Sequence, residues 1–203
     1  PPRSTLFPYT TLFRSPSEVA RIIGNDSRVD YAEPKYVQRL CAVPNDSLYT
    51  QQSVYFMRLK MAEAWNLAKG ESGSALMAVV DGGTNIAHPD LAANIWNNSG
   101  EIPNNGQDDD QNGFVDDIHG WNFANNSADP TGLAHTPLNS EHGTHVAGIC
   151  GAVTNNNKGM TGASWNARLM AVNASSPYSD NAIVYGYDGI LYAADNGADI
   201  INC

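Results

Sequence analysis

The longer, C-terminal part of the sequence alternates strand patterns with helix patterns, and this alternation limits the possible folds more than any other feature. Short apolar runs predict buried strands over residues 74–83 (SALMAVVDGG), 167–172 (ARLMAV) and 198–202 (ADIIN). Helices are expected between them, over residues 141–154 (EHGTHVAGICGAVT) and 182–197 (AIVYGYDGILYAADNG). Strands that alternate with helices favour a parallel sheet with helices on its faces. The sequence therefore predicts an α/β fold with a central parallel sheet.

The N-terminal part has a different character. Residues 1–15 contain TLFPYTTLFRS, which lacks helical or strand periodicity and resembles an in-frame translation of a sequencing-library adapter, so we set them aside as an artefact. Residues 16–41 predict a small α+β unit, with a short helix, a GNDS turn and a strand over 28–32 (RVDYA). Residues 60–70 (KMAEAWNLAKG) predict a helix that is capped by Gly70.

Composition excludes several classes of function. The net charge is -10 with only 11 Lys and Arg residues, which argues against a nucleic-acid partner. No apolar run approaches the roughly 18 residues of a membrane-spanning helix, so no membrane partner is expected. Cys41, Cys150 and Cys203 are widely spaced without a CxxC motif, which supports neither a disulfide framework nor a zinc site.

Two short motifs carry candidate catalytic residues. Asp81 follows a predicted buried strand, and ligands of parallel sheets bind at the carboxyl ends of strands. The motif HGTHVAG places His142 and His145 three residues apart at the start of a predicted helix. The two histidines could instead be structural or bind zinc, but a hydrolytic zinc site needs about three protein ligands and a Glu-type base, and no HExxH motif occurs.

Taken together, these motifs resemble the subtilisin-like serine proteases, the subtilase family. AVVDGGTNIAHPDL, HGTHVAGICGAVTNNNKGMTGAS and GILYAADNGADIIN are similar to three successive blocks of the family, nearest to its thermitase-like branch. SRVDYAEPKYV resembles the end of the family's inhibitory propeptide. The resemblance implies a three-layer subtilisin-like fold, incomplete here, with a propeptide remnant over 16–41 and the N-terminal part of a truncated peptidase domain over 42–203. Gly82 departs from the Ser or Thr that more often follows the family's Asp.

The resemblance also implies catalytic roles. His142 would be the general base and Asp81 the carboxylate that orients it, whereas His145 would be a buried structural residue on the following turn. No Gly-Thr-Ser block and no oxyanion Asn in its family context occur in the sequence, so no nucleophilic serine is assigned. Because loss of the nucleophile lowers turnover on the order of a million-fold, the fragment itself is expected to be inactive.

Structural calcium is the cofactor that the resemblance implies. PNDSLY, HPDL and VTNNNKGM match the strong calcium site of the thermitase-like branch. The side chains of Asp46, Asp90 and Asn156 and the carbonyl groups of Val153, Lys158 and Met160 would be the ligands, since oxygen ligands from separate segments suit calcium.

A second calcium candidate is the acidic stretch DDDQNGFVDD. Asp108, Asp110 and Asn112 occupy alternate positions before Gly113, as in an EF-hand loop. The twelfth position is His119 where an EF-hand has Glu. The stretch is interpreted as a calcium-stabilised insertion, with a plain acidic surface loop as the alternative.

The sequence thus predicts part of a secreted serine endopeptidase, made as a zymogen, that acts on proteins or peptides, with its own propeptide as inhibitor and chaperone. One alternative is a non-catalytic, calcium-stabilised binding module of the same fold. Another is an unrelated doubly wound domain that uses Asp81 for phosphate or metal chemistry, but that reading leaves HGTHVAG unexplained.

Overall fold

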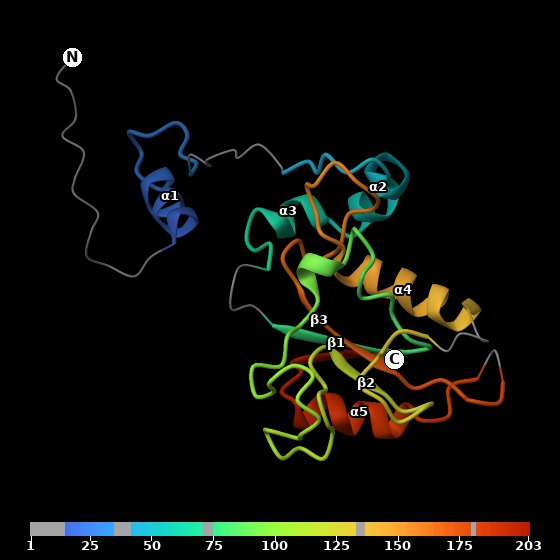
Figure 1. The fold of residues 1–203 in the computed structure, drawn as a ribbon. Helices are drawn as coiled ribbons and strands as arrows, with labels where there is room; N and C mark the ends of the chain where they lie inside the picture. The colour runs from blue at the N-terminus through green and yellow to red at the C-terminus, as the bar shows by residue number, and fades with distance from the viewer. Residues whose placement is uncertain (1–14, 35–41, 71–74, 133–136, 180–181) are drawn as a thin grey trace. The chain divides into compact units, whose positions relative to one another are not determined.

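The structure of the protein is a computed structural model that describes residues 15–34, 42–70, 75–132, 137–179 and 182–203 (Figure 1). Contacts within the chain divide it into two units, Pro1–Leu40 and Cys41–Cys203. Residues 1–14 and 35–41 lie outside the description, so the artefact and the propeptide boundary remain predictions.

The first unit contains one described helix, α1 (Pro16–Gly24), which begins at Ser15. The Ser15 hydroxyl accepts a hydrogen bond from the backbone N–H of Glu18 at 3.2 Å, which satisfies one free donor of the first helical turn. The strand predicted over 28–32 is wrong, because those residues form no strand and no described segment pairs with them. An isolated extended segment without a partner gains no ladder of hydrogen bonds.

The second unit is built on a four-stranded parallel sheet in the order β2-β3-β1-β4 (Figure 1). Its strands are β1 (Leu76–Asp81), β2 (Gly120–Asn122), β3 (Arg168–Asn173) and β4 (Ile200–Asn202). The predictions of β1, β3 and β4 are confirmed. Strand β2 was not predicted, because three residues are too few to show a periodic pattern.

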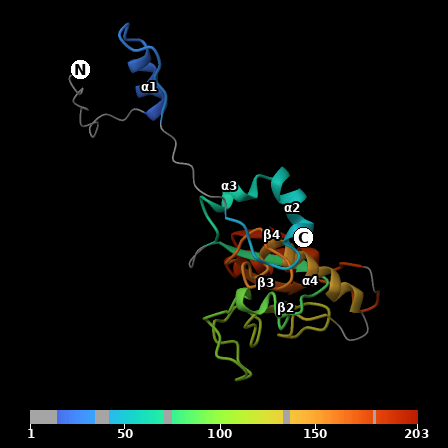
Figure 2. The same cartoon turned by 90° about the horizontal axis from the view of Figure 1, so that it is seen from above.

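Helices cover both faces of this sheet. Helix α4 (Pro137–Gly151) contributes Ala147 to a buried cluster with Val79 and Leu169. Helix α5 (Gly186–Asp195) covers the opposite face, which presents the alternate residues of β1 and β3 (Figures 1 and 2). The predicted three-layer α/β architecture is confirmed.

Two short helices precede the sheet, α2 (Tyr49–Arg58) and α3 (Met61–Trp65). Lys60 separates them with a φ of 54°, in the left-handed region that ends a helix. The helix predicted over 60–70 is therefore half as long as expected. Gly70 does have a positive φ, but it lies five residues beyond Trp65 and does not cap α3. A 3₁₀ turn, η1 (Ala92–Asn94), follows β1.

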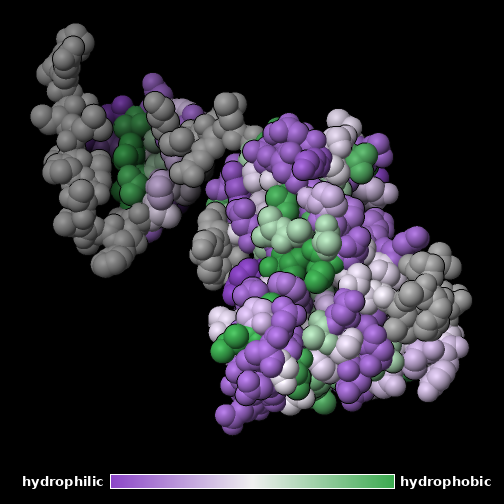
Figure 3. Space-filling model, viewed as in Figure 1, coloured by the Kyte–Doolittle hydropathy of each residue, from purple (hydrophilic) through white to green (hydrophobic). Residues whose placement is uncertain are grey.

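None of the described helices is long and apolar enough to cross a membrane. Hydrophilic side chains cover most of the visible face of the Cys41–Cys203 unit, with smaller apolar areas between them (Figure 3).

Candidate active site

Asp81 and His142 meet at the carboxyl end of the sheet. Asp81 is the last residue of β1, and its side chain is 13% exposed, whereas that of His142 on α4 is 71% exposed. Nδ1 of His142 lies 2.8 Å from Oδ1 and 3.0 Å from Oδ2 of Asp81. The backbone N–H of Gly82 also donates to Oδ1, at 2.6 Å. The structure therefore brings together the two predicted catalytic residues, which are 61 positions apart.

This arrangement assigns a role to each nitrogen of the imidazole. A carboxylate facing Nδ1 favours the tautomer that carries its proton on Nδ1, which leaves a lone pair on Nε2. Among the described residues, none forms a hydrogen bond with Nε2 of His142. With the ring largely exposed, Nε2 can accept a proton from a hydroxyl group, while Asp81 stabilises the imidazolium that forms.

Glycine allows the close contact between the helix and the loop after β1. A Cβ added to Gly143 would lie only 2.2 Å from the carbonyl oxygen of Gly83 and 3.2 Å from Cβ of Asp81. Gly83 itself has a φ of +102°, which side chains disfavour. The residue after His142 must therefore be small for the imidazole to reach the carboxylate.

The prediction that His145 is buried is wrong. Its side chain is exposed and lines a hollow of about 510 Å³, together with residues such as Leu48, Asp90 and Met160. Residues of the loop after β1, such as His88 and Leu91, line the same hollow. The spacing of the two histidines placed them on neighbouring turns but did not decide which side of the helix is covered.

The residues predicted for the strong calcium site lie around one loop. The buried carboxylate of Asp46 accepts the backbone N–H groups of Asn155 and Asn156, both at 3.0 Å. The buried carboxylate of Asp90 accepts Nδ2 of Asn156 and the backbone N–H of Met160, both at 2.8 Å. Two segments that are far apart in the sequence, around Asp46 and Asp90, thus converge on the loop 153–160, which makes three segments in all.

The groups predicted as calcium ligands in and around this loop are all oxygen atoms. The carbonyl groups of Val153, Lys158 and Met160 accept no hydrogen bond from any described residue. Such oxygens, with nearby buried carboxylates and no sulfur or imidazole, form the kind of ligand set that suits calcium. These residues could hold a calcium ion and through it link the three segments.

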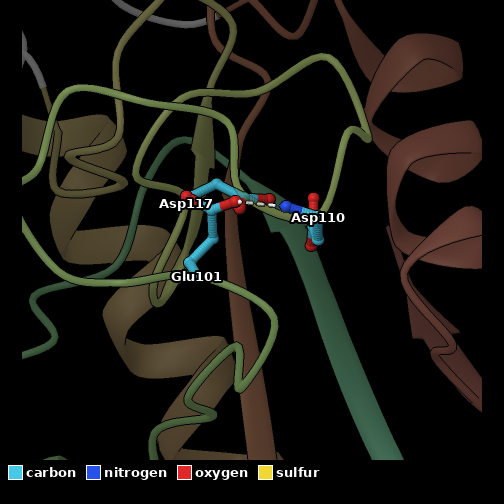
Figure 4. Close-up of side chains that lie close together, drawn as sticks. All are labelled: Glu101, Asp110 and Asp117. Atoms are coloured by element: carbon cyan, nitrogen blue, oxygen red, sulfur yellow. Dashed lines mark hydrogen bonds between the residues drawn. The ribbon is translucent and has the colours of Figure 1, made fainter.

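The acidic loop has a different geometry from the predicted one. One carboxylate oxygen from each of Glu101, Asp110 and Asp117 lies within 4.8 Å of the others, which makes this a set that could hold a metal ion (Figure 4). Asp108 is not a member of this set; its carboxylate accepts the backbone N–H groups of Asn112 and Gly113. Asp110 is therefore the one predicted carboxylate that the cluster includes.

Neutral donors surround Asp117, which is fully buried. It accepts hydrogen bonds from Nδ2 of Asn98, Nδ2 of Asn112 and the hydroxyl of Tyr192. Burial raises the pKa of the Asp117 carboxyl, and the hydrogen bonds offset part of that shift. Burial and the contact with Asp117 also raise the pKa of Tyr192.

Sequence reasoning missed Glu101 and Asp117. Asp117 accepts a hydrogen bond from the hydroxyl of Tyr192 on α5, 75 residues away, and no local sequence pattern predicts such a contact. Glu101 binds backbone N–H groups of the loop at Asp109, Asp110 and Asp116, so its role depends on how the loop closes. The available signal was only the general one that acidic residues are dense between 101 and 117.

Comparisons with known proteins agree with this geometry. A model described as the subtilase family matches residues 73–203. A thermophilic serine proteinase from Bacillus sp. strain AK1 is 34% identical over 184 residues, which are 91% of this chain and 39% of the relative. Thermitase from Thermoactinomyces vulgaris is 31% identical over 160 residues, 78% of this chain and 46% of the relative.

A solved structure of a protease from Pseudoalteromonas arctica PAMC 21717 superimposes with a TM-score of 0.55 at 29% identity. That match covers 80% of this chain and 50% of the other. The chain spans less than half the length of the two sequence relatives.

Proposed function

The chain belongs to the subtilase family, and from this premise we propose that it is part of a secreted serine endopeptidase that hydrolyses peptide bonds through an Asp-His-Ser triad. The contact of 2.8 Å between Nδ1 of His142 and Asp81 carries the proposal. Nε2 of His142 takes the proton of the serine hydroxyl as that oxygen attacks the scissile carbonyl, and later gives it to the leaving amine. Asp81 holds the tautomer and stabilises the imidazolium.

We propose that the nucleophilic serine lies in the part of the relatives' length that this chain does not span. No Gly-Thr-Ser block follows the two catalytic residues within the 203 positions. An active site that has the general base but no nucleophilic serine keeps only a small fraction of the turnover of the complete triad. We therefore propose that the 203-residue chain alone does not cleave peptides.

Proteins and peptides are the proposed substrates, and the identity of the relatives as a serine proteinase and thermitase supports this. Residues 16–41 are proposed as the end of an inhibitory propeptide that also assists folding. Support for this comes from the sequence SRVDYAEPKYV and from the separation of Pro1–Leu40 as a unit of its own.

Structural calcium is proposed at the loop 153–160, with Asp46, Asp90 and Asn156 and the carbonyl groups of Val153, Lys158 and Met160 as its ligands. The ion would offset the charge of two buried carboxylates and link the segments that meet there. Calcium is also proposed at the acidic loop, where Asp110 and its neighbour Asn112 adjoin the cluster of Glu101 and Asp117.

The test begins with the gene. The DNA that encodes the chain is sequenced across both ends of this reading frame. The protein encoded by the extended frame, called the longer product, is then expressed with and without residues 1–15. Its hydrolysis of casein is compared with that by the 203-residue chain. We expect activity only in the longer product, lost after treatment with a serine-directed fluorophosphonate. A longer product with another residue at the serine position, or one inactive with all three residues in place, would instead favour the binding module.

A further inference from the structure

A four-residue segment, Asp129–Gly132, contacts both elements that carry the catalytic pair; we call it the bridging turn. On one side it contacts the loop after β1, where the backbone N–H of Thr84 donates to the carbonyl of Pro130 at 3.1 Å. A Cβ added to Gly83 would lie 2.8 Å from the backbone nitrogen of Gly132. The bridging turn therefore sits in direct backbone contact with the loop that follows Asp81.

On its other side the bridging turn contacts helix α4. A Cβ added to Gly132 would lie 2.3 Å from Cβ of Ser140, two residues before His142. Such separations leave no space for a side chain, and closely packed atoms transmit a displacement instead of absorbing it. A shift of this turn must therefore move the Asp81 loop, the start of α4, or both.

Two buried asparagines hold the bridging turn in place. Nδ2 of Asn122 donates to the carbonyl groups of Asp129 at 2.9 Å and Thr131 at 3.2 Å, and Nδ2 of Asn173 donates to Thr131 at 3.3 Å. Their exposures are 1% and 0%. A buried amide N–H or carbonyl group that lacks a hydrogen-bond partner lowers the stability of the fold by about 1–3 kcal/mol. These hydrogen bonds therefore hold both the asparagine side chains and the carbonyl groups of the bridging turn in place.

The sheet places these asparagines beside the catalytic carboxylate. Asn122 and Asn173 are the last residues of β2 and β3, and they pair in register. Asn173 also pairs in register with Asp81. The row Asn122, Asn173 and Asp81 therefore crosses three neighbouring strands at the carboxyl edge of the sheet.

We propose that Asn122 and Asn173 are positioning residues for the peptidase reaction: through the bridging turn they fix the separation between Asp81 and His142. This rests on the proposed function, which makes that pair the catalytic base and its orienting group. The contact between the two is a hydrogen bond of 2.8 Å, and such bonds weaken steeply when the groups separate or tilt. A misplacement of about 1 Å can cost 10²-fold in rate.

The proton on Nδ1 of His142 gives a direct readout that does not require a serine. A proton held between Nδ1 and a carboxylate resonates far downfield in the NMR spectrum, and the spectra are recorded near 0 °C and at mildly acidic pH because the ring is exposed and such protons exchange with water. In the 203-residue chain we expect this signal in the wild type, its loss in Asp81→Ala, and its loss or broadening in Asn122→Ala.

Asn94→Ala is the matched control. Asn94 is also buried, at 8% exposure, and its Nδ2 also donates to two backbone carbonyls, those of Gly151 and Trp165, at 2.9 and 3.2 Å. It has no contact with the bridging turn. Both asparagine variants are expected to lower the melting temperature, but Asn94→Ala should keep the downfield proton.

A second pair of variants covers the case in which Asn122→Ala does not fold. Gly132→Ala introduces a Cβ against that of Ser140, and adding Ser140→Gly removes the clashing atom. We expect the single variant to lose the signal and the double variant to regain it.

The outcomes separate the two proposals. Absence of the proton in the folded wild type would contradict the catalytic pair itself. Its presence in the wild type together with its retention in folded Asn122→Ala, or in Gly132→Ala if Asn122→Ala does not fold, would overturn the positioning role and leave the pair intact.

Discussion

The N-terminal half of helix α4 meets the loop after Asp81 through close backbone contacts and the hydroxyl of Thr144, whereas its C-terminal half meets the sheet through apolar side chains; we call these halves its N-terminal and C-terminal ends. Near the first end, Gly143 lies against Gly83 with no space for a Cβ. Further along, Ala147 packs with Val79 and Leu169 in a buried cluster. The first end sets the geometry of the imidazole, and the second buries the apolar area that stabilises the fold.

The comparison teaches that chemistry and stability can be changed separately, the first on helix α4 and the second in the sheet beneath it. His142 is 71% exposed and removes little apolar surface from water, so its replacement should cost little stability. Leu169 is almost fully buried, so its truncation should cost stability and leave the catalytic contact in place.

The largest expected effect is on activity, at the N-terminal end. In the longer product, His142→Ala should lower kcat on the order of 10⁶-fold and Asp81→Asn about 10⁴-fold, because the second change leaves the base present in the wrong tautomer. The measurement is hydrolysis of a chromogenic peptide, with the melting temperature recorded alongside. A fall in melting temperature as large as that caused by truncating Leu169 would break the distinction between the two ends.

Truncation towards the C-terminal end should reverse this pattern. Leu169→Ala leaves a cavity and should lower the free energy of unfolding by about 2–5 kcal/mol. The downfield proton of His142 should persist while the chain is folded. Ile149→Ala, on the half-exposed side of α4, is the control and should change stability by no more than about 0.5 kcal/mol. Urea titrations measure both variants.

Calcium should add to the stability of the same C-terminal end, because α4 leads directly into the loop 153–160. At a hundredfold excess over its Kd, a bound ion adds about 2.7 kcal/mol. Asp90→Ala should therefore lower the melting temperature more in calcium than in chelator, whereas the exposed Asp188→Ala should show no such difference. An equal loss in both buffers would contradict calcium binding by Asp90.

The smallest effect concerns Cys150, near the end of α4. Burial raises the pKa of this thiol above its ordinary 9.0, so little thiolate is present at pH 8. In the unfolded chain the thiol keeps its ordinary pKa, so it loses its proton at a lower pH than in the folded chain. The contribution of this thiol to the free energy of unfolding is therefore fully present below pH 9 and is lost as pH rises through the folded-state pKa. Alkylation by iodoacetamide should be slower than at the exposed Cys203, as peptide mass spectrometry would show. Equal rates at pH 8 would mean that this end of the helix opens readily.

Much of the fold followed from local patterns. The runs of β1 and β3 stood out because they are short, apolar and almost wholly buried, and the helix over 141–151 stood out because small apolar residues follow the histidine motif. The strand predicted over 28–32 did not form, and β2 was missed, since strands depend on partners that lie elsewhere in the chain.

The candidate site divides in the same way. Asp81 and His142 were predicted because a carboxylate at a strand end and a glycine-flanked histidine are local signals, and their resemblance to a known family is specific. The exposure of His145 and the cluster of Glu101 and Asp117 were not predicted, because both depend on which surfaces other segments cover.

By itself, the sequence determined the strands β1, β3 and β4 and the helices between them, the place of Asp81 at a strand end and the small residue beside His142. Only the tertiary structure decided that Asn122, Asn173 and Asp81 form one row and that the bridging turn contacts both the loop after Asp81 and helix α4. The physical reason is range. Periodicity and backbone preference act over a few residues, whereas a hydrogen bond across 61 positions exists only after packing has set the distance between the segments that carry it.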